Sequence, residues 1–280
     1  MTIDILSDLH LDFYFQSAKT PCVNEVKAVF DSIFYSTTES ELGDILIIAG
    51  DLGHCNNQNI EILKIFQSEY YKYIICVLGN HDYYLVDYKS VDKYHNNSLH
   101  RVKEMRELIN ASENMYCLNG DVVEINGVKF AGCDSSYDNS YMQNYFPFLD
   151  DDSLINKMWK NGLNDYRMMG NINSYMEIYN IEINKLKSIY DKCDVMITHV
   201  NPSYLHEHIS PTYINDKFNT FFTFDGHKYM KEGNMKFWIF GHTHDNVEYE
   251  FHGVKCICNP LGYPNESKCR ESAKIRRIEI

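Results

Sequence analysis

Seven side chains that could ligate metal ions follow short apolar stretches of this 280-residue chain. They are Asp8, His10, Asp51, Asn80, His199, His242 and His244. Carboxylate, amide and imidazole donors without a thiolate suit Mn, Fe, Zn or Ni, whereas Ca and Mg prefer shells of oxygen alone. Two such cations, about 3.5 to 4 Å apart, can hold the attacking and the leaving oxygens of a phosphoryl displacement. Asp51 is the natural bridging carboxylate because it lies between the others in chain order.

Each of these groups stands where a predicted strand ends. Apolar runs at 3–6, 45–49 and 74–78 precede Asp8, Asp51 and Asn80, and helical spacing of apolar residues fills 24–35 and 60–73 between them. Alternating strands and helices indicate parallel strands with right-handed crossovers, which bring the polar groups to one edge of a sheet. Two further apolar strands, at 195–197 and 237–240, lead to His199 and to the pair His242 and His244.

The second half of the chain predicts antiparallel pairing as well. Asn126-Gly127, a dipeptide preferred in two-residue hairpin turns, joins the strands expected at 122–125 and 128–131. His252-Gly253 joins a second hairpin, 247–251 with 254–258, and 273–280 supplies a final strand. Cys256 and Cys258 could ligate a metal, but two strand residues facing one side is the favoured interpretation.

Residues 134–192 form a Tyr- and Asn-rich insertion within what we expect to be a single domain over 1–280. A lid whose Tyr166 stacks on a base and whose Arg167 clamps a phosphate is one interpretation. A small helical layer whose aromatic residues form a core is the other, and the residues alone favour neither. A helix over 176–190 closes the segment.

Composition restricts the partners. Lys plus Arg is 26 and Asp plus Glu is 39, so the net charge of 26 − 39 = −13 argues against long nucleic acid as a partner. Nine scattered cysteines without a Cys-x-x-Cys pair favour a reduced, cytoplasmic compartment over a disulfide framework. No apolar window approaches the ~18 residues of a membrane helix, so we expect a soluble protein without a membrane partner.

Several other histidines have less distinctive positions. His54 lies close behind Asp51 and could join the metal ligands, although a loop histidine is the favoured interpretation. His206, His208 and His227 fall in a segment expected to be an exposed loop with a short helix, and we expect them at the surface.

Five short motifs together resemble the calcineurin-like metallophosphoesterase superfamily over residues 4 to 260. They are Asp8-x-His10, Gly50-Asp51, Gly79-Asn80-His81-Asp82, Thr198-His199 and Gly241-His242-x-His244. The resemblance implies an α/β fold, a four-layer α/β/β/α sandwich of two mixed sheets flanked by helices. It also implies that Asp8, His10, Asp51 and His244 hold one metal, and that Asp51, Asn80, His199 and His242 hold the other. Asn164-Asp165-Tyr166-Arg167 is similar to a stretch in the insertion of some bacterial and viral members, which favours the lid.

The same resemblance makes His81 the non-ligand imidazole that stabilises the phosphoryl group or protonates the leaving oxygen, with Asp82 orienting it. We therefore expect a dinuclear hydrolase of phosphomonoesters or phosphodiesters, in which a metal-bridging hydroxide attacks phosphorus in line. Two divalent transition-metal ions are the expected cofactors, with manganese favoured, and a phosphorylated small molecule or nucleotide is the expected substrate. The alternatives are a phosphoprotein phosphatase, a nuclease, which requires a basic stripe not visible in the sequence, and a noncatalytic scaffold. The substrate, the native metal and the oligomeric state are left open by the sequence.

Overall fold

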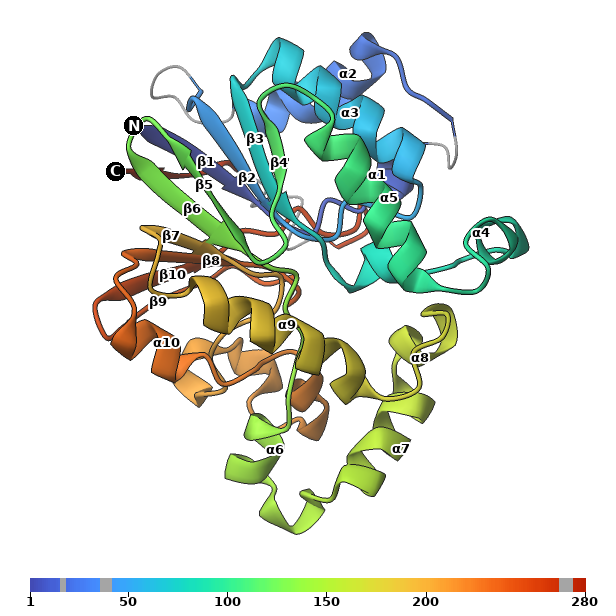
Figure 1. Ribbon diagram of the computed structural model, residues 1–280, viewed down its shortest axis with the longest axis vertical. Coiled ribbons are helices and arrows are strands. Elements are labelled where there is room, and N and C mark those ends of the chain that lie inside the picture. Colours follow the sequence, from blue (N-terminus) through green and yellow to red (C-terminus); the bar gives the residue numbers. More distant parts are fainter. Residues whose placement is uncertain (16–18, 36–41, 267–273) are drawn as a thin grey trace.

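Two mixed β-sheets pack face to face, and helices cover both outer faces of the pair (Figure 1). This architecture comes from a computed structural model that describes residues 1–15, 19–35, 42–266 and 274–280. The predicted four-layer α/β/β/α sandwich is confirmed. Among the described residues, no helix is long and apolar enough to cross a membrane.

The first sheet holds the strands that lead to Asp8, Asp51 and Asn80. Its order is β11 (Arg276–Glu279), β1 (Thr2–Leu6), β2 (Ile45–Ala49), β3 (Tyr73–Val77) and β4 (Met115–Cys117). Strands β1 to β4 are mutually parallel and β11 is antiparallel to β1. The parallel order expected for the first three strands is therefore confirmed. Strand β4 was not predicted from the sequence.

The second sheet holds the strands that lead to His199, His242 and His244. Its order is β5 (Asp121–Ile125), β6 (Val128–Gly132), β7 (Val195–Ile197), β8 (Phe237–Phe240), β10 (Val254–Cys258) and β9 (Val247–Phe251). Both predicted hairpins are present, since β5 pairs with β6 and β9 with β10 in antiparallel register. Asn126 and Gly127 have φ of 51° and 84°, as a type I′ turn requires.

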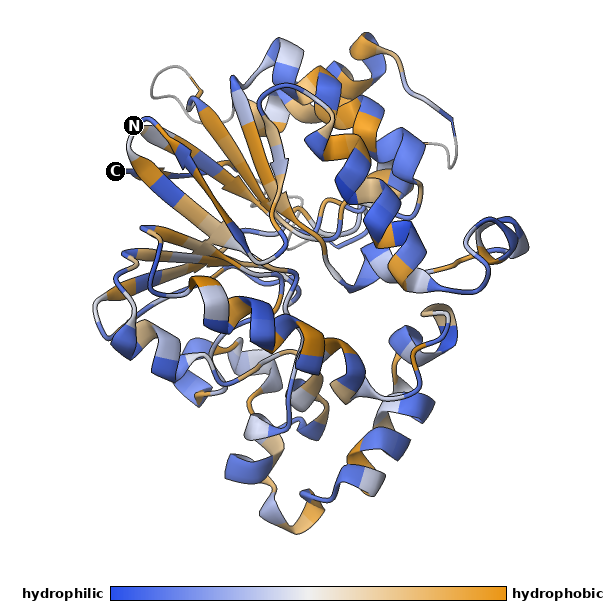
Figure 2. Ribbon diagram, viewed as in Figure 1, coloured by the Kyte–Doolittle hydropathy of each residue, from blue (hydrophilic) through white to orange (hydrophobic). Residues whose placement is uncertain are grey.

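Alternating side chains of the buried strands serve two cores, which explains the continuous apolar runs. Ile45 and Ile47 face the second sheet and join a core between the sheets with Ile197 and Ile239. Leu46 and its alternate neighbours face outward and pack under the helices. The central strands β2 and β3 are largely hydrophobic, whereas the edge strand β11 is hydrophilic (Figure 2). Burial on both faces fixes the register, so the polar residues after each strand emerge at a defined edge.

Helices close the sandwich on either side. The first sheet is covered by α2 (Val23–Phe34), α3 (Asn56–Glu69) and α5 (Ser98–Asn110), and the second by α9 (Tyr175–Ile189) and α10 (His227–Glu232) (Figure 1). Two short helices, α1 (Leu11–Tyr14) and α4 (Tyr88–Lys93), follow the ends of β1 and β3. Helix α3 begins four residues earlier than its apolar spacing suggested, and the expected start of the last strand at 273 lies outside the described residues.

Residues 134–192 contain helices rather than strands. They form α6 (Ser140–Tyr145), the short 3-10 turn Pro147–Leu149, α7 (Asp152–Gly162) and α8 (Asn164–Met168), followed by α9. Tyr137, Tyr141 and Trp159 are buried there. These three aromatics belong to a core, as one of the two interpretations proposed, whereas Phe148 and Tyr166 are exposed. Helix α8 reaches the site described below.

Two further expectations concern cysteine and histidine. The eight cysteines in the described ranges are all free thiols, and Cys269 lies outside them. His208 is buried, against our expectation, because its ring stacks on Tyr249 at 3.9 Å and its Nδ1 contacts Ser203 Oγ at 2.8 Å. A histidine surrounded by polar residues in the sequence gave no sign of that partner.

Candidate metal centre and active site

The loops after β1, β2 and β8 hold most of the candidate ligands in an unusual backbone conformation. Positive φ angles occur at Asp8 (52°), His10 (43°), Asp51 (56°), His242 (71°) and His244 (49°). Such left-handed conformations cost a non-glycine residue about 1 to 3 kcal/mol and concentrate at functional sites. Five of them within one pair of ligand sets indicate that the backbone is bent to aim these side chains at a common point.

Glycines before the ligands permit the close approach of the strand ends. A Cβ on Gly79 would lie 2.2 Å from Asp51 Oδ1, and one on Gly50, at φ 89°, would lie 2.3 Å from His199 Nδ1. Any side chain at either position would therefore occupy the space in which the ligands converge.

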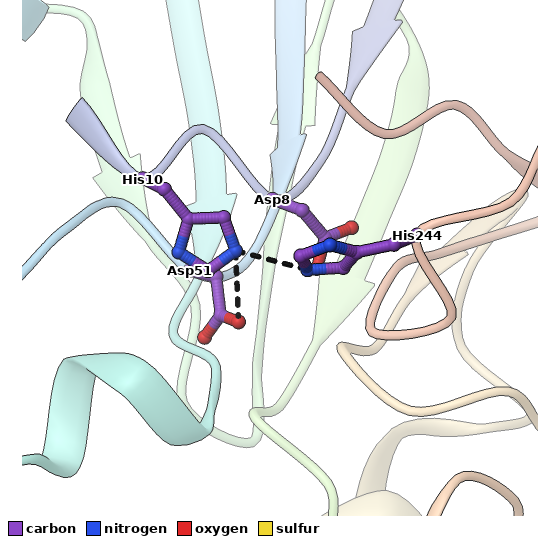
Figure 3. A group of neighbouring side chains, drawn as sticks. All are labelled: Asp8, His10, Asp51 and His244. Carbon is purple, nitrogen blue, oxygen red and sulfur yellow. Dashed lines mark hydrogen bonds and ion pairs between the residues drawn. The ribbon is translucent and has the colours of Figure 1, made fainter. Parts of the chain in front are cut away.

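The first ligand set joins Asp8, His10, Asp51 and His244 (Figure 3). His10 Nε2 lies 3.0 Å from His244 Nε2 and 3.8 Å from Asp51 Oδ2, and His244 Nε2 lies 3.6 Å from Asp8 Oδ1. Two ring nitrogens and two carboxylates thus face a common space.

The second set joins Asp51, His199 and His242, and Asn80 lies beside it. His199 Nε2 is 3.4 Å from Asp51 Oδ2 and 3.1 Å from Asn80 Oδ1. His199 Nδ1 donates to the Ala49 carbonyl at 2.8 Å, and His242 Nε2 donates to the Phe221 carbonyl at 3.0 Å. Since a carbonyl only accepts, Nε2 of His199 and Nδ1 of His242 are left with the lone pairs that a metal requires.

The charges of the site are strongly perturbed by one another. Burial acts to raise the pKa of Asp51, but His199 and His81 outweigh it and hold that pKa well below its ordinary value. Burial acts to lower the pKa of His199, yet Asp51 raises it to about 10. Burial and the neighbouring His199 lower the pKa of His242 to about 4. The negative charge of Asp51 thus favours positive charge at the second ligand set, which a bound cation would supply.

The donors present fit two divalent transition-metal ions. Each set mixes imidazole nitrogen with carboxylate oxygen and contains no thiolate, and Asp51 belongs to both. The structure therefore brings together all seven residues that the sequence singled out as ligands.

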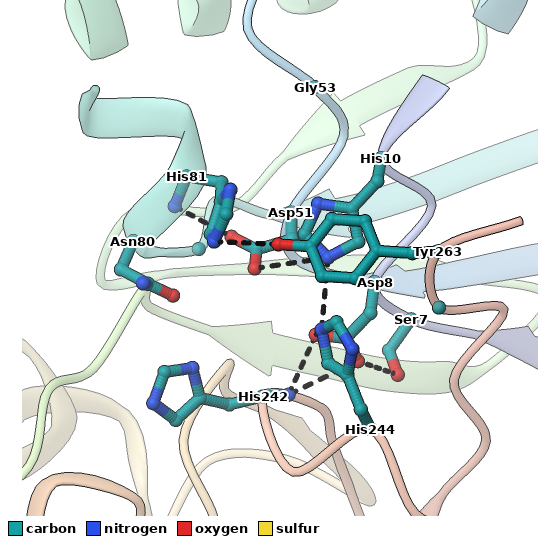
Figure 4. A network of polar contacts seen from close by, with 12 residues as sticks. Ser7, Asp8, His10, Asp51, Gly53, Asn80, His81, His242, His244 and Tyr263 are labelled. Atoms are coloured by element: carbon teal, nitrogen blue, oxygen red, sulfur yellow. Dashed lines mark hydrogen bonds and ion pairs between the residues drawn. The ribbon is translucent and has the colours of Figure 1, made fainter. Parts of the chain in front are cut away.

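His81 lies next to these sets and outside them (Figure 4). Its backbone N–H donates to Asp51 Oδ1 at 2.8 Å, while its ring Nδ1 lies 3.1 Å from His54 Nε2 and its Nε2 lies 3.3 Å from the Tyr263 hydroxyl. Burial lowers the pKa of His81 to about 4, against the opposing effect of Asp51.

Contrary to our expectation, Asp82 does not contact the ring of His81. Its buried carboxylate accepts from the backbone N–H groups of Gly79 at 2.8 Å and Leu52 at 3.2 Å. Burial and the nearby Asp51 raise the pKa of Asp82 to about 6. Asp82 thus joins the loops after β2 and β3, because its side chain is turned into the protein toward these N–H groups, whereas the His81 ring lines the cleft.

The Asn164–Arg167 stretch serves the site through a different residue from those proposed. Tyr166 is 40% exposed, Arg167 donates to the Asn161 carbonyl at 3.1 Å, and neither lines the cleft beside the metal sets. Asp165 lies between them and the site, buried, and accepts from Asn80 Nδ2 at 2.9 Å. With its amide nitrogen held there, Asn80 turns its oxygen toward the second ligand set.

Three residues that contact the candidate site were not identified from the sequence. Glu266 accepts from His244 Nδ1 at 2.9 Å, and Tyr263 stacks on His10 with ring centroids 4.3 Å apart. Asp12 contacts His54. Glu266 and Tyr263 follow no apolar period, so only the folded chain shows them, whereas the alternation Asp8-x-His10-x-Asp12 was a visible sign.

A cleft of about 440 Å³ opens over the ligand sets. Its wall is largely aromatic and apolar beyond the metal-ligand candidates, with Tyr84, Leu163, Ile209, Tyr213, Phe218, Phe222 and Tyr263. No lysine or arginine lines the cleft within the described ranges. The site therefore offers a hollow large enough for a small ester.

A two-sheet sandwich with Asp and His ligand sets at the ends of its strands is the architecture of the metallophosphoesterases. The sequence matches the calcineurin-like phosphoesterases over residues 1–246, and the chain belongs to that family. It is 25% identical over 272 residues to the uncharacterized protein L509 of Acanthamoeba polyphaga mimivirus, covering 93% of this chain and 91% of that one. The structure resembles the phosphopantetheinyl hydrolase PptH of Mycobacterium tuberculosis with a TM-score of 0.67 and 16% identity, covering 99% of this chain and 95% of that one.

Proposed function

We propose that this protein is a metal-dependent phosphoesterase that hydrolyses a small phosphoester, with a phosphodiester or nucleotide favoured. The observation that carries the proposal is Asp51, whose carboxylate belongs to both ligand sets and accepts from the backbone N–H of His81. Asp51 thereby contacts both candidate metal positions and the backbone of His81, the candidate general acid.

Asp8, His10, Asp51 and His244 would hold one divalent cation, and Asp51, Asn80, His199 and His242 the other. Bound there, the two cations would supply positive charge for the phosphoryl oxygens and a water molecule of lowered pKa. His81 Nε2 faces the cleft and would give a proton or a hydrogen bond to the leaving oxygen. Manganese is the metal we favour.

The lining of the cleft supports a small, singly charged ester over a polyanion. A nuclease needs cationic side chains along its phosphate track, and none lines the described part of this cleft. Tyr213, Phe218 and Phe222 instead offer aromatic surface next to the ligand sets, on which a base or an apolar leaving group could pack.

The test is a turnover screen of the manganese-loaded protein. The substrates that cover the alternatives are bis(p-nitrophenyl) phosphate, p-nitrophenyl phosphate, cyclic nucleotides and a phosphopeptide. A phosphopantetheinyl compound is added because the M. tuberculosis protein of similar structure is a phosphopantetheinyl hydrolase. We expect diester turnover, and we expect His81→Ala to reduce it by roughly 10²-fold with the metal content unchanged. No turnover of any substrate by protein with metals bound would favour a noncatalytic scaffold.

A further inference from the structure

His54 contacts the candidate acid rather than the metal ligands. Its Nε2 lies 3.1 Å from His81 Nδ1, and its Nδ1 lies 2.8 Å from Asp12 Oδ2. The three residues come from three segments: Asp12 from α1, His54 from the loop after β2, and His81 from the turn after β3. A continuous line of polar contacts thus runs from Asp12 to the ring that faces the cleft.

The direction of each hydrogen bond from Asp12 to His81 follows from the chemistry of the Asp12 carboxylate. Asp12 is used as an acceptor twice, because its Oδ1 also accepts from the His54 backbone N–H at 3.0 Å. An aspartate carboxylate can only accept, so His54 carries its hydrogen on Nδ1. A neutral imidazole protonated there has its lone pair on Nε2, and His81 must then donate from Nδ1.

The same order leaves His81 Nε2 without a hydrogen in the neutral ring and turned to the cleft. In this order of donors, the Tyr263 hydroxyl, 3.3 Å away, would donate to it. The opposite tautomer of His81 would place a lone pair against the lone pair of His54, a repulsive contact.

The surrounding contacts hold the two imidazoles in this arrangement. Buried Arg101 donates to the Gly53 carbonyl at 2.5 Å and to the His81 carbonyl at 2.7 Å, and so joins the backbone segments that carry both rings. The rings of His54 and His81 lie nearly parallel, with centroids 5.2 Å apart at 26°. The His54 and Asp12 side chains are only 12% and 10% exposed, which shields their contact from water.

We propose that His54 and Asp12 are positioning residues for His81 and fix its neutral form as the Nδ1–H tautomer with Nε2 directed at the leaving oxygen. The proposal rests on the proposed phosphoesterase function. In each turnover, His81 Nε2 takes a proton from solvent and passes it to the leaving oxygen as the phosphorus–oxygen bond breaks. The leaving group departs as an alcohol, and His81 returns to the same neutral tautomer.

The first test needs no turnover. Nitrogen chemical shifts of histidine-labelled, zinc-loaded protein report which ring nitrogen of His81 carries hydrogen. We expect Nδ1–H in the wild type and a mixture of tautomers in His54→Ala. An Nε2–H tautomer in the wild type, or an unchanged Nδ1–H tautomer in His54→Ala, would overturn the proposal.

The second test compares two diesters of equal charge, because a general acid matters more when the leaving group is basic. His54→Ala should lower kcat on diphenyl phosphate by roughly 10-fold or more, and by much less on bis(p-nitrophenyl) phosphate. His54→Gln should recover part of the loss, because its side-chain amide can also accept from His81 and donate to Asp12. In His81→Ala protein, the additional His54→Ala change should have little further effect.

The matched control is His252→Asn, which replaces an exposed histidine in the turn between β9 and β10 and should behave as wild type. Equal losses on both diesters in His54→Ala, with metal content unchanged, would count against positioning of the acid. If the wild type hydrolyses no ester, the proposed function fails, while the tautomer measurement still decides the roles of His54 and Asp12.

Discussion

Replacing Asp165 by alanine should weaken both the fold and the second ligand set, although Asp165 is not a metal-ligand candidate. The carboxylate is buried and accepts from Asn80 Nδ2 at 2.9 Å, from Tyr137 OH at 2.5 Å and from the Tyr84 hydroxyl. Asp165→Ala removes the acceptor from all three donors at once. Asn80 Nδ2 then keeps its contact to the Tyr84 hydroxyl at 3.0 Å, but it loses the carboxylate that fixes this hydroxyl and helps to turn the amide oxygen toward His199.

The magnitude follows from the number of donors. A buried polar group left without a partner costs about 1 to 3 kcal/mol, and the Tyr84 and Tyr137 hydroxyls together would cost about 2 to 6 kcal/mol, since Asn80 Nδ2 keeps the Tyr84 oxygen as a partner. Removing the buried carboxylate also removes its own desolvation cost, and water entering the space satisfies part of the rest, so we expect a loss near the lower limit, about 2 kcal/mol. Loss of a residue that orients a metal ligand typically lowers metal affinity by about 10- to 100-fold.

Urea unfolding of the metal-free protein measures the first effect, and titration calorimetry with manganese measures the second. Tyr137→Phe is the matched control, because it leaves the Asn80 contact intact while it removes one donor from Asp165 and the acceptor of the Trp159 indole N–H. It should cost about 1 to 2 kcal/mol without changing metal affinity. If Asp165→Ala binds manganese as tightly as the wild type at both positions, then Asp165 does not orient Asn80.

Two further predictions concern the site and a remote histidine pair. Gly79→Ala places a Cβ 2.2 Å from Asp51 Oδ1, so it should reduce the amount of bound metal and lower turnover by roughly 10²-fold. Gly127→Asn, in an open turn, should change neither quantity. Metal analysis and steady-state kinetics measure both effects. His208 and His227 both contact Ser203 Oγ, and burial lowers their pKa values from the ordinary 6.5. Their neutral forms are favoured by folding, so the stability they contribute is present above pH 6.5 and lost as the pH falls below it. Urea midpoints from about pH 7.5 to about pH 5.5 should therefore fall less steeply in His208→Gln than in the wild type, and equal slopes would refute the assignment.

The ligand sets could be predicted from the sequence because buried parallel strands leave few alternatives. Continuous apolar runs require burial on both faces, and the polar residue after each run must then emerge at the strand end. The runs before Asp51 and Asn80 met this condition, and the predicted order of parallel strands placed both residues at one edge. Chain order alone also indicated that Asp51 lies between the two sets.

The surroundings of the ligands could not be predicted in the same way. Asp82 was expected to orient His81 because it is adjacent in sequence, but neighbouring side chains in a tight turn point apart. His54 instead reaches His81 from 27 residues away. Such contacts depend on how two loops are placed relative to each other, and this placement cannot be predicted from the periodicity of apolar residues or from the spacing of motifs. The same reason explains why Glu266 was missed and why Arg167 was favoured over Asp165.

The charge distribution links metal occupancy to substrate choice. The cleft has acidic groups at Asp165, Asp216 and Glu266, and no lysine or arginine lines it within the described ranges. The protein as a whole carries a net charge of −13. In such a field, two cations bound at the proposed positions would be the main source of attraction for an anionic ester, so each additional negative charge on the substrate would have to be balanced by the same two ions. A singly charged diester has the least negative charge for the two cations to balance, and we therefore favour diesters over monoesters and polyphosphates at this site.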